Sequence, residues 1–286
     1  MPMKISSSVV AIFAVLMSCA NVTFGQRVPE SVYKEGYDAI KKLFGQAVVA
    51  GDLEVCKELL EKNAFYVNEA DANGLTQLHY AAMSGQAELC RLLLQHGAKA
   101  DIARKGTAGE IYYTPLEAAI ANDHTEAALI LIDSISPESL KAVRGRNCSP
   151  LFLAIVNENV EIIKALLAKN ADVNTPGKVG DLIQTPLVYA VALGNKEIGK
   201  ILLDAGADLH FEQGDICTSE ALFYAALTRN YDLCSFLVDS KINLDARYRH
   251  GQTVLHILLS EKNLGSPPES VGKKIGFLRY VEQKSR

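Results

Sequence analysis

The sequence lacks any block of positive charge. Its 286 residues include 29 Lys or Arg and 33 Asp or Glu, which gives a formal net charge of -4. No run of Lys and Arg is longer than two residues. A protein that binds nucleic acid usually carries a clustered basic surface that neutralises phosphates. We therefore expect no nucleic-acid partner.

Motifs of catalysis and metal binding are missing as well. The sequence has no His-Glu-x-x-His motif, no Gly-x-Ser-x-Gly elbow and no glycine-rich phosphate loop. Its six cysteines include no Cys-x-x-Cys pair, which zinc and redox sites commonly use. His124, His210 and His250 are scattered. Because a function has to be argued from a site and none is visible, we predict no enzyme activity, no cofactor and no metal.

A single apolar run stands out near the start of the chain. Residues 9–17 are entirely apolar and follow Lys4. The run is too short to span a bilayer, but it has the length of the core of a secretory signal. We therefore interpret residues 1–25 as a signal peptide and expect the protein in the periplasm.

The end of this signal has two interpretations. Small residues between positions 18 and 25 suit ordinary signal peptidase. Residues 16–19, Leu-Met-Ser-Cys, also resemble a bacterial lipobox, in which Cys19 becomes the lipidated first residue of an outer-membrane lipoprotein. The two alternatives stay open. Met3 and Met17 could each serve as a later start, which would give a cytosolic form.

The rest of the sequence contains a repeated pattern. Hydrophobic residues make up 49% and charged residues 22% of the chain, which leaves ample apolar material for a core. One leucine recurs within similar short segments, at a spacing close to the period of about 33 residues found in one class of repeat proteins. These leucines are Leu78, Leu116, Leu151, Leu187, Leu222 and Leu255.

The segments around these leucines share a sequence. Residues 76–82 read Thr-Gln-Leu-His-Tyr-Ala-Ala, and residues 114–119 read Thr-Pro-Leu-Glu-Ala-Ala. Further along each copy, residues 85–98 match residues 195–208 in phase. Together they resemble ankyrin repeats strongly. The resemblance implies an all-α ankyrin-repeat solenoid of about seven helix–turn–helix units, with hairpin loops and terminal caps.

The resemblance also divides the chain. Residues 26–70 are predicted to hold an N-terminal segment and a capping repeat, because the copy at 47–60 lacks the Thr-Pro-Leu-His start. Residues 71–265 are predicted to hold the repeats, and residues 266–286 a C-terminal capping helix. We expect this last helix to turn one apolar face inward, formed by Val271, Ile275, Leu278 and Val281.

Each repeat contains residues that favour its helices. Thr or Ser before Pro supplies an N-cap oxygen, and Pro at the first helical position loses no hydrogen bond. In the second helix, Cys56, Cys90 and Cys234 occupy one equivalent packing position. Neighbouring helices lie about 8–10 Å apart, beyond the ~7 Å Cα limit for a disulfide, so we expect buried free thiols. The resemblance further implies that His79 and His256 form structural hydrogen bonds between neighbouring repeats.

The binding surface is predicted from the same alignment. The resemblance implies that partners contact the hairpin tips and the ends of the first helices, which would line a concave face. The residues at these positions are largely apolar or aromatic, as in a protein interface, although some could instead pack under their own hairpins. They are Leu75, Met83, Ile111, Tyr113, Asn122, Arg146, Val156, Asn157, Leu182, Leu193, Ile216, Leu227, Tyr248, Arg249 and His250.

Hairpin length gives a second indication of the binding side. Residues 104–113 exceed the repeat consensus by about five residues. Shorter extensions occur at 177–181 and 211–215. Insertions within repeats often mark the binding edge, because loops carry specificity. The extensions add Glu110, Tyr112 and Asp181 to the predicted surface.

Three classes of function are compatible with an exported ankyrin-repeat protein. One is an inhibitor, which would resemble bacterial immunity proteins that neutralise secreted phospholipase toxins of the type VI kind. Another is a periplasmic scaffold or stress-protection partner of an envelope enzyme. The third, a hydrolytic or redox enzyme, would need a pocket with convergent polar groups, which the sequence does not indicate. We favour the inhibitor, because stoichiometric binding needs a large preorganised surface and no chemistry.

Overall fold

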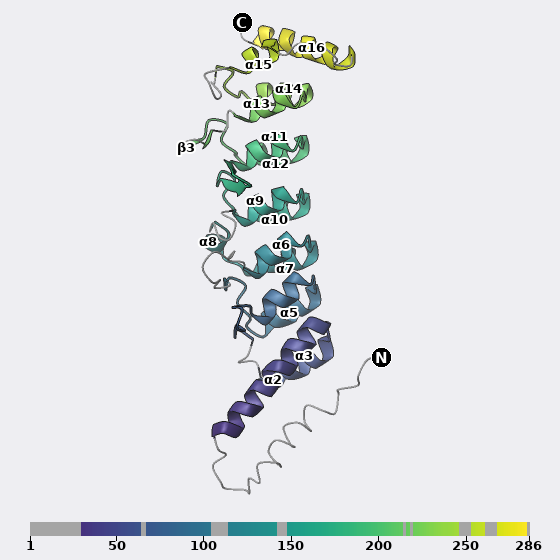
Figure 1. Ribbon diagram of the computed structural model, residues 1–286, viewed down its shortest axis with the longest axis vertical. Helices are drawn as coiled ribbons and strands as arrows, with labels where there is room; N and C mark the ends of the chain where they lie inside the picture. The colour runs from purple at the N-terminus through teal and green to yellow at the C-terminus, as the bar shows by residue number, and fades with distance from the viewer. Residues whose placement is uncertain are drawn as a thin grey trace. The chain divides into compact units, whose positions relative to one another are not determined.

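The computed structural model describes residues 30–63, 67–103, 114–141, 148–213, 216–217, 220–245, 253–260 and 268–284. The chain divides into two compact units, residues 1–135 and 136–286. Within each unit, short antiparallel helix pairs form successive layers (Figure 1). The predicted all-α ankyrin-repeat fold is confirmed, with short β-hairpins as its only strands in the described part of the chain.

Unit 1 contains three described helix pairs. Its helices are α2 (Glu30–Ala50), α3 (Leu53–Asn63), α4 (Gln77–Met83), α5 (Ala87–Gln95), α6 (Pro115–Ala121) and α7 (Thr125–Ser134). The first helices of successive pairs, α2, α4 and α6, pack in one row, and the second helices, α3, α5 and α7, pack in another. Each pair therefore buries its apolar residues against the next.

Unit 2 begins with the short helix α8 (Pro137–Leu140) and contains helix pairs of the same kind. Its helices are α9 (Pro150–Val156), α10 (Val160–Ala168), α11 (Pro186–Ala192), α12 (Lys196–Asp204), α13 (Glu220–Leu227), α14 (Tyr231–Asp239), α15 (Val254–Ser260) and α16 (Pro268–Lys284). The row of first helices runs from α9 through α11 and α13 to α15. Two antiparallel hairpins precede α11 and α13: β1 (Gly177–Val179) with β2 (Leu182–Gln184), and β3 (Glu212–Gln213) with β4 (Ile216–Cys217).

The predicted helix starts are confirmed at the Thr and Ser anchors. At the start of α6, the Thr114 hydroxyl accepts from the Glu117 amide at 3.3 Å, and the Glu117 carboxylate accepts from the Thr114 amide at 2.7 Å. This reciprocal capping box satisfies two amides that the helix itself cannot. His79 has the same place in α4, and its Nδ1 accepts from the Thr76 amide at 3.1 Å. The His79 Nδ1 bond is thus made inside its own repeat, and the bond between repeats that the resemblance implies stays a prediction.

Side-chain amides form several of the hydrogen bonds between repeats. In unit 1, Asn68 Nδ2 donates to the Gly97 carbonyl at 2.8 Å, and Asn68 Oδ1 accepts from the Lys99 amide at 2.7 Å. In unit 2, Asn174 Oδ1 accepts from the Asp208 amide at 2.8 Å. Each bond spans about one repeat, so it fixes the stacking of neighbouring hairpins.

The second-helix cysteines are core residues, as predicted. Cys56, Cys90 and Cys234 are buried free thiols. Burial raises the pKa of each from 9.0 to about 12, with Asp52 adding to the effect at Cys56. These thiols are therefore protonated and packed like small apolar groups.

The last helix differs from the prediction in its inward face. Phe277 and Val281 are buried, whereas Ile275 is 47% exposed. The inward residues are spaced four apart, and Ile275 lies on another side of α16. The choice of Ile275 as an inward residue was therefore wrong, because the apolar residues of α16 do not all lie on one side.

Candidate protein-binding surface

Helix α11 presents an aromatic and an aliphatic side chain on the same side. Tyr189 is partly exposed and Leu193, at the C-cap, is 39% exposed. Residues four apart on a helix lie one above the other, so the two side chains share a face. The Tyr189 ring packs on the ring of Phe152, with 5.2 Å between centroids, and Phe152 is fully buried. The tyrosine is therefore supported from below by the core.

The neighbouring first helices of unit 2 repeat this arrangement. On α13, Tyr224 is partly exposed and Leu227 is 47% exposed. On α9, Leu153 and Val156 are both partly exposed. Helices α9, α11 and α13 pack side by side. We name this set the unit 2 face: Leu153, Val156, Tyr189, Leu193, Tyr224 and Leu227.

The hairpins border the start of α11 and α13. Leu182 and Ile183 on β2 are 44% and 50% exposed, and β2 lies beside β4. Consecutive strand residues point to opposite sides, so β2 exposes apolar side chains in both directions. The base of the hairpin is anchored, because Gly177 pairs with the buried Gln184 and the Cys148 thiol donates to the Lys178 carbonyl at 3.3 Å.

A carboxylate is fixed at the other end of the unit 2 face. Glu158 follows α9 with a left-handed backbone, φ 55°, where Gly194 stands after α11. Its Oε2 accepts from Asn195 Nδ2 at 2.8 Å. Burial first, then the nearby groups of Cys148 and Glu158, raise the pKa of the Tyr189 hydroxyl. The Tyr189 hydroxyl is therefore neutral at physiological pH, and the charge of Glu158 contributes to keeping it so.

Unit 1 uses the equivalent tyrosine differently. The Tyr80 hydroxyl on α4 donates to Asp71 Oδ2 at 2.6 Å. Burial acts to raise the pKa of Asp71, but this bond and those from the Leu75 and Asn73 amides outweigh it and lower the pKa. Tyr80 therefore holds the hairpin of its own repeat. Met83, three residues further on, is 42% exposed.

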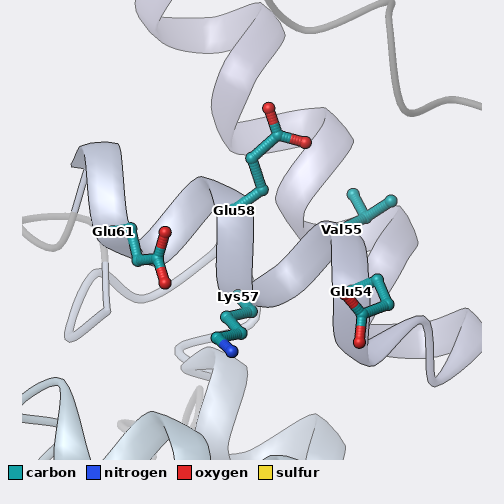
Figure 2. A pocket seen from close by; sticks show the side chains of 5 residues that line it. All are labelled: Glu54, Val55, Lys57, Glu58 and Glu61. Atoms are coloured by element: carbon teal, nitrogen blue, oxygen red, sulfur yellow. The ribbon is translucent and has the colours of Figure 1, made fainter.

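The outer helix α3 carries a separate, acidic hollow of about 320 Å³. Figure 2 shows its lining of Glu54, Glu58 and Glu61 with Lys57 and Val55, all from the same helix. The described residues contain no cluster of His, Cys, Asp and Glu that could hold a metal ion. The hollow is thus a charged helix surface without converging groups from a second element.

The predicted surface residues fall into four groups. Met83, Asn122, Asp181, Leu182, Leu193 and Leu227 are exposed. Leu75, Val156 and Asn157 are half-buried, so they have less surface for a partner than the sequence indicated. Ile216 has a described backbone, in β4. Cys19, Glu110, Ile111, Tyr112, Tyr113, Arg146, Tyr248, Arg249 and His250, with the whole signal segment 1–25, lie outside the described residues.

Sequence reasoning missed the middle of the unit 2 face. Tyr189 and Tyr224 each lie two residues after the anchor leucine of their repeat, just before an alanine. Leu153 has the same position in α9. The signal was present, since these residues lie three or four positions before Val156, Leu193 and Leu227. The helical period therefore places them on the same side as residues already chosen.

Comparison with known proteins identifies the family. A model of ankyrin repeats in three copies matches residues 44–141, 101–176, 137–213 and 187–265. The matches cover most of the chain, which therefore belongs to the ankyrin-repeat family. Ankyrin repeats typically bind proteins, so the coarse functional prediction, a module for protein–protein interaction, is supported.

Relatives share the repeats and differ in the rest of their length. The putative palmitoyltransferase ZDHHC13 of Danio rerio is 28% identical over 213 residues, which cover 74% of this chain and 31% of that protein. The NF-kappa-B p105 subunit of Gallus gallus is 32% identical over 167 residues, covering 58% and 16%. This chain thus spans less than a third of either relative. Their eukaryotic sources give no support to a bacterial immunity protein.

Solved structures agree on the fold. The ankyrin repeat domain of Bcl-3, described as a unique member of the IkappaB protein family, matches with a TM-score of 0.65 and 22% identity, covering 82% of this chain and 97% of that one. The human ASB11 ankyrin repeat domain matches with a TM-score of 0.59 and 24% identity, covering 81% and 96%. Across the described residues, no helix has the length and apolar character needed to cross a membrane.

Proposed function

We propose that this chain is an exported protein-binding module that binds one partner protein through the unit 2 face and the adjoining hairpins. The observation that carries the proposal is the alignment of Tyr189 with Leu193, and of Tyr224 with Leu227, on packed helices. Tyrosine provides a large contact area at low conformational cost, and exposed apolar residues gathered on one face favour a partner. The backing of Tyr189 by Phe152 supports a surface that needs no rearrangement to bind.

The finer form of the proposal is a bacterial immunity protein that neutralises a secreted toxin of the phospholipase or lipase kind. It is supported by the apolar run at residues 9–17, which favours export, and by a rigid surface suited to stoichiometric inhibition. Location in the periplasm, or at the outer membrane through a lipid on Cys19, would place the inhibitor beside the membrane that such a toxin attacks. The same surface is compatible with a scaffold that supports an envelope enzyme.

Capture of partners tests the proposal. The chain from residue 26 onward would be immobilised, incubated with extract of the source cell and washed, and the retained proteins identified by mass spectrometry. One toxin-like lipase at a 1:1 ratio supports the immunity role. Several envelope proteins support the scaffold instead, and no stoichiometric partner contradicts both.

Localisation needs its own test. Fractionation of the source cell, with the intact mass of the purified protein, distinguishes the two signal interpretations. A lipidated Cys19 adds the mass of its acyl chains and sends the protein to the membrane fraction, and Cys19→Ser releases it. A soluble periplasmic protein that begins after residue 25 supports ordinary cleavage, and retention in the cytosol contradicts export.

A further inference from the structure

We infer that the partner places an arginine or lysine side chain between Leu193 and Glu158, as the charged contact of the unit 2 face. The inference rests on the proposed function, because it names the chemistry of the partner at the same surface. It starts from the position of the Glu158 carboxylate, which is held by Asn195.

Glu158 has φ 55°. In the left-handed region a residue with a side chain is disfavoured relative to the right-handed helix, whereas glycine adopts this region readily. Gly85 and Gly194 occupy the equivalent position after α4 and α11. Asp123 and Arg229 have the same left-handed backbone after α6 and α13, so the inference rests on the contact made by the Glu158 carboxylate and not on its φ.

The carboxylate of Glu158 is held in place by a hydrogen bond. Its Oε2 accepts from Asn195 Nδ2 at 2.8 Å, and Asn195 is itself held as the N-cap of α12, accepting from the Ile198 amide at 3.0 Å. The ion pairs of the described residues do not include Glu158. Lys196, which follows Asn195, lies over the ring of Phe236, 5.6 Å from its centroid.

Apolar surface lies next to this charge. Leu193 precedes Asn195 by two residues and is 39% exposed, and Tyr189 lies one turn before it on α11. Arginine and lysine have long apolar stems that pack on such surface while the charged end reaches a carboxylate. A partner residue of this kind satisfies both features at once, whereas a purely aliphatic residue would leave the charge uncovered.

The test uses the full-length chain and a phage-displayed library of random 12-residue peptides as the probe. The best binders are synthesised, and their affinities for the wild type, Glu158→Gln and Asp204→Asn are measured by fluorescence anisotropy. Glutamine keeps the size of Glu158 and its bond to Asn195 but removes the charge. Asp204→Asn makes the same charge change at an exposed position at the end of α12.

The inference predicts that selected peptides carry Arg or Lys beside an apolar residue. It predicts that Glu158→Gln weakens their binding by about tenfold or more, since hydrogen bonds to charged groups are among the stronger ones. Asp204→Asn should bind like the wild type, and both variants should melt like it. Peptides without a basic residue, equal binding to Glu158→Gln, or an equal loss in Asp204→Asn would overturn the inference.

The proposed function can survive that failure. If the selected peptides are non-basic and a Leu193→Asp variant no longer binds them, the cationic contact is overturned. The unit 2 face then remains the protein-binding surface. Failure of partner capture, in contrast, bears on the function and leaves the peptide result unchanged.

Discussion

Gly177 lies directly against the ring of Phe152. A Cβ atom added to Gly177 would be 2.4 Å from two atoms of that ring, closer than real Cβ contacts come. Phe152 in turn carries Tyr189, at 5.2 Å between ring centroids. The base of the β1–β2 hairpin, the core of unit 2 and the exposed tyrosine are therefore one packed stack.

Gly177→Ala should destabilise unit 2. Phe152 is fully buried and cannot move into solvent, so the added methyl group overpacks the core at a cost of about 1–3 kcal/mol. Urea unfolding, followed by circular dichroism, measures the change. Lys178→Ala, at the next and exposed position of β1, is the control and should unfold within about 0.5 kcal/mol of the wild type. Equal stability of Gly177→Ala would contradict the close packing.

Asn68→Ala should weaken the stacking of repeats in unit 1. It removes two hydrogen bonds that join neighbouring hairpins, to Gly97 and Lys99, at a net cost of about 1–2 kcal/mol. Asn174→Ala removes a single bond, to Asp208, and should cost about half as much. Thermal unfolding of both variants checks the order. A larger loss for Asn174→Ala would show that these bonds do not set the stability of the stacks.

Lys241→Gly should stabilise the protein. Lys241 follows α14 with φ 66°, where Gly206 follows α12 with φ 89°. Relief of the left-handed strain is worth about 0.5–1 kcal/mol after the higher entropy of unfolded glycine is subtracted. The reverse change, Gly206→Lys, should destabilise by a similar amount, because no atom lies within 4 Å of an added Cβ and only the backbone is strained. Chemical denaturation should show opposite signs for the two.

The buried thiols make stability depend on pH in the alkaline range. Cys56, Cys90 and Cys234 have folded-state pKa values of about 12, against 9.0 when they are exposed by unfolding. Only the unfolded state loses these protons between the two values. The free energy of unfolding should therefore keep this contribution below pH 9 and lose it as the pH rises toward 12. Melting temperatures across pH 8 to 11 measure the loss.

The same burial protects the thiols from alkylation. Iodoacetamide at pH 8 should leave Cys56, Cys90 and Cys234 unmodified in the native protein and label all three in denaturant, since the thiolate is the reacting form. Peptide mass spectrometry separates them from Cys19, Cys148 and Cys217. Rapid labelling of Cys90 in the native state would show that the core opens readily.

Much of the fold could be predicted from the sequence because residues close together in each repeat determine where its helices begin. Thr114, Ser149 and Thr185 stand before Pro, and each begins a helix where predicted. The equivalence of Cys56, Cys90 and Cys234 followed from phase alone, and all three are buried. Periodicity was less reliable at the end of the chain, where Ile275 shares an apolar spacing with its neighbours and yet faces outward.

The candidate site was predictable only in part, because exposure depends on packing between repeats. Leu193 and Leu227 were found by their distance from the anchor leucines. Tyr189 was missed although the helical period places it on the side of Leu193, and its support by Phe152 on α9 cannot be seen in either segment alone. The left-handed backbone of Glu158 was likewise not predicted, because the equivalent position holds Asp123, Gly194 and Arg229 in other repeats without any change in the surrounding pattern.

The most direct test of the account is whether the unit 2 face holds the partner. The captured partner would be titrated by calorimetry against the wild type and against the double variant Leu193→Asp/Leu227→Asp. The control is a second double variant, Lys164→Asp/Lys200→Asp, which changes two exposed residues on the second helices. The account predicts 1:1 binding to the wild type and to the second-helix variant, and a loss of about a hundredfold or more for the leucine variant, because charged groups would then be buried against apolar surface. Unchanged affinity of the leucine variant would contradict it.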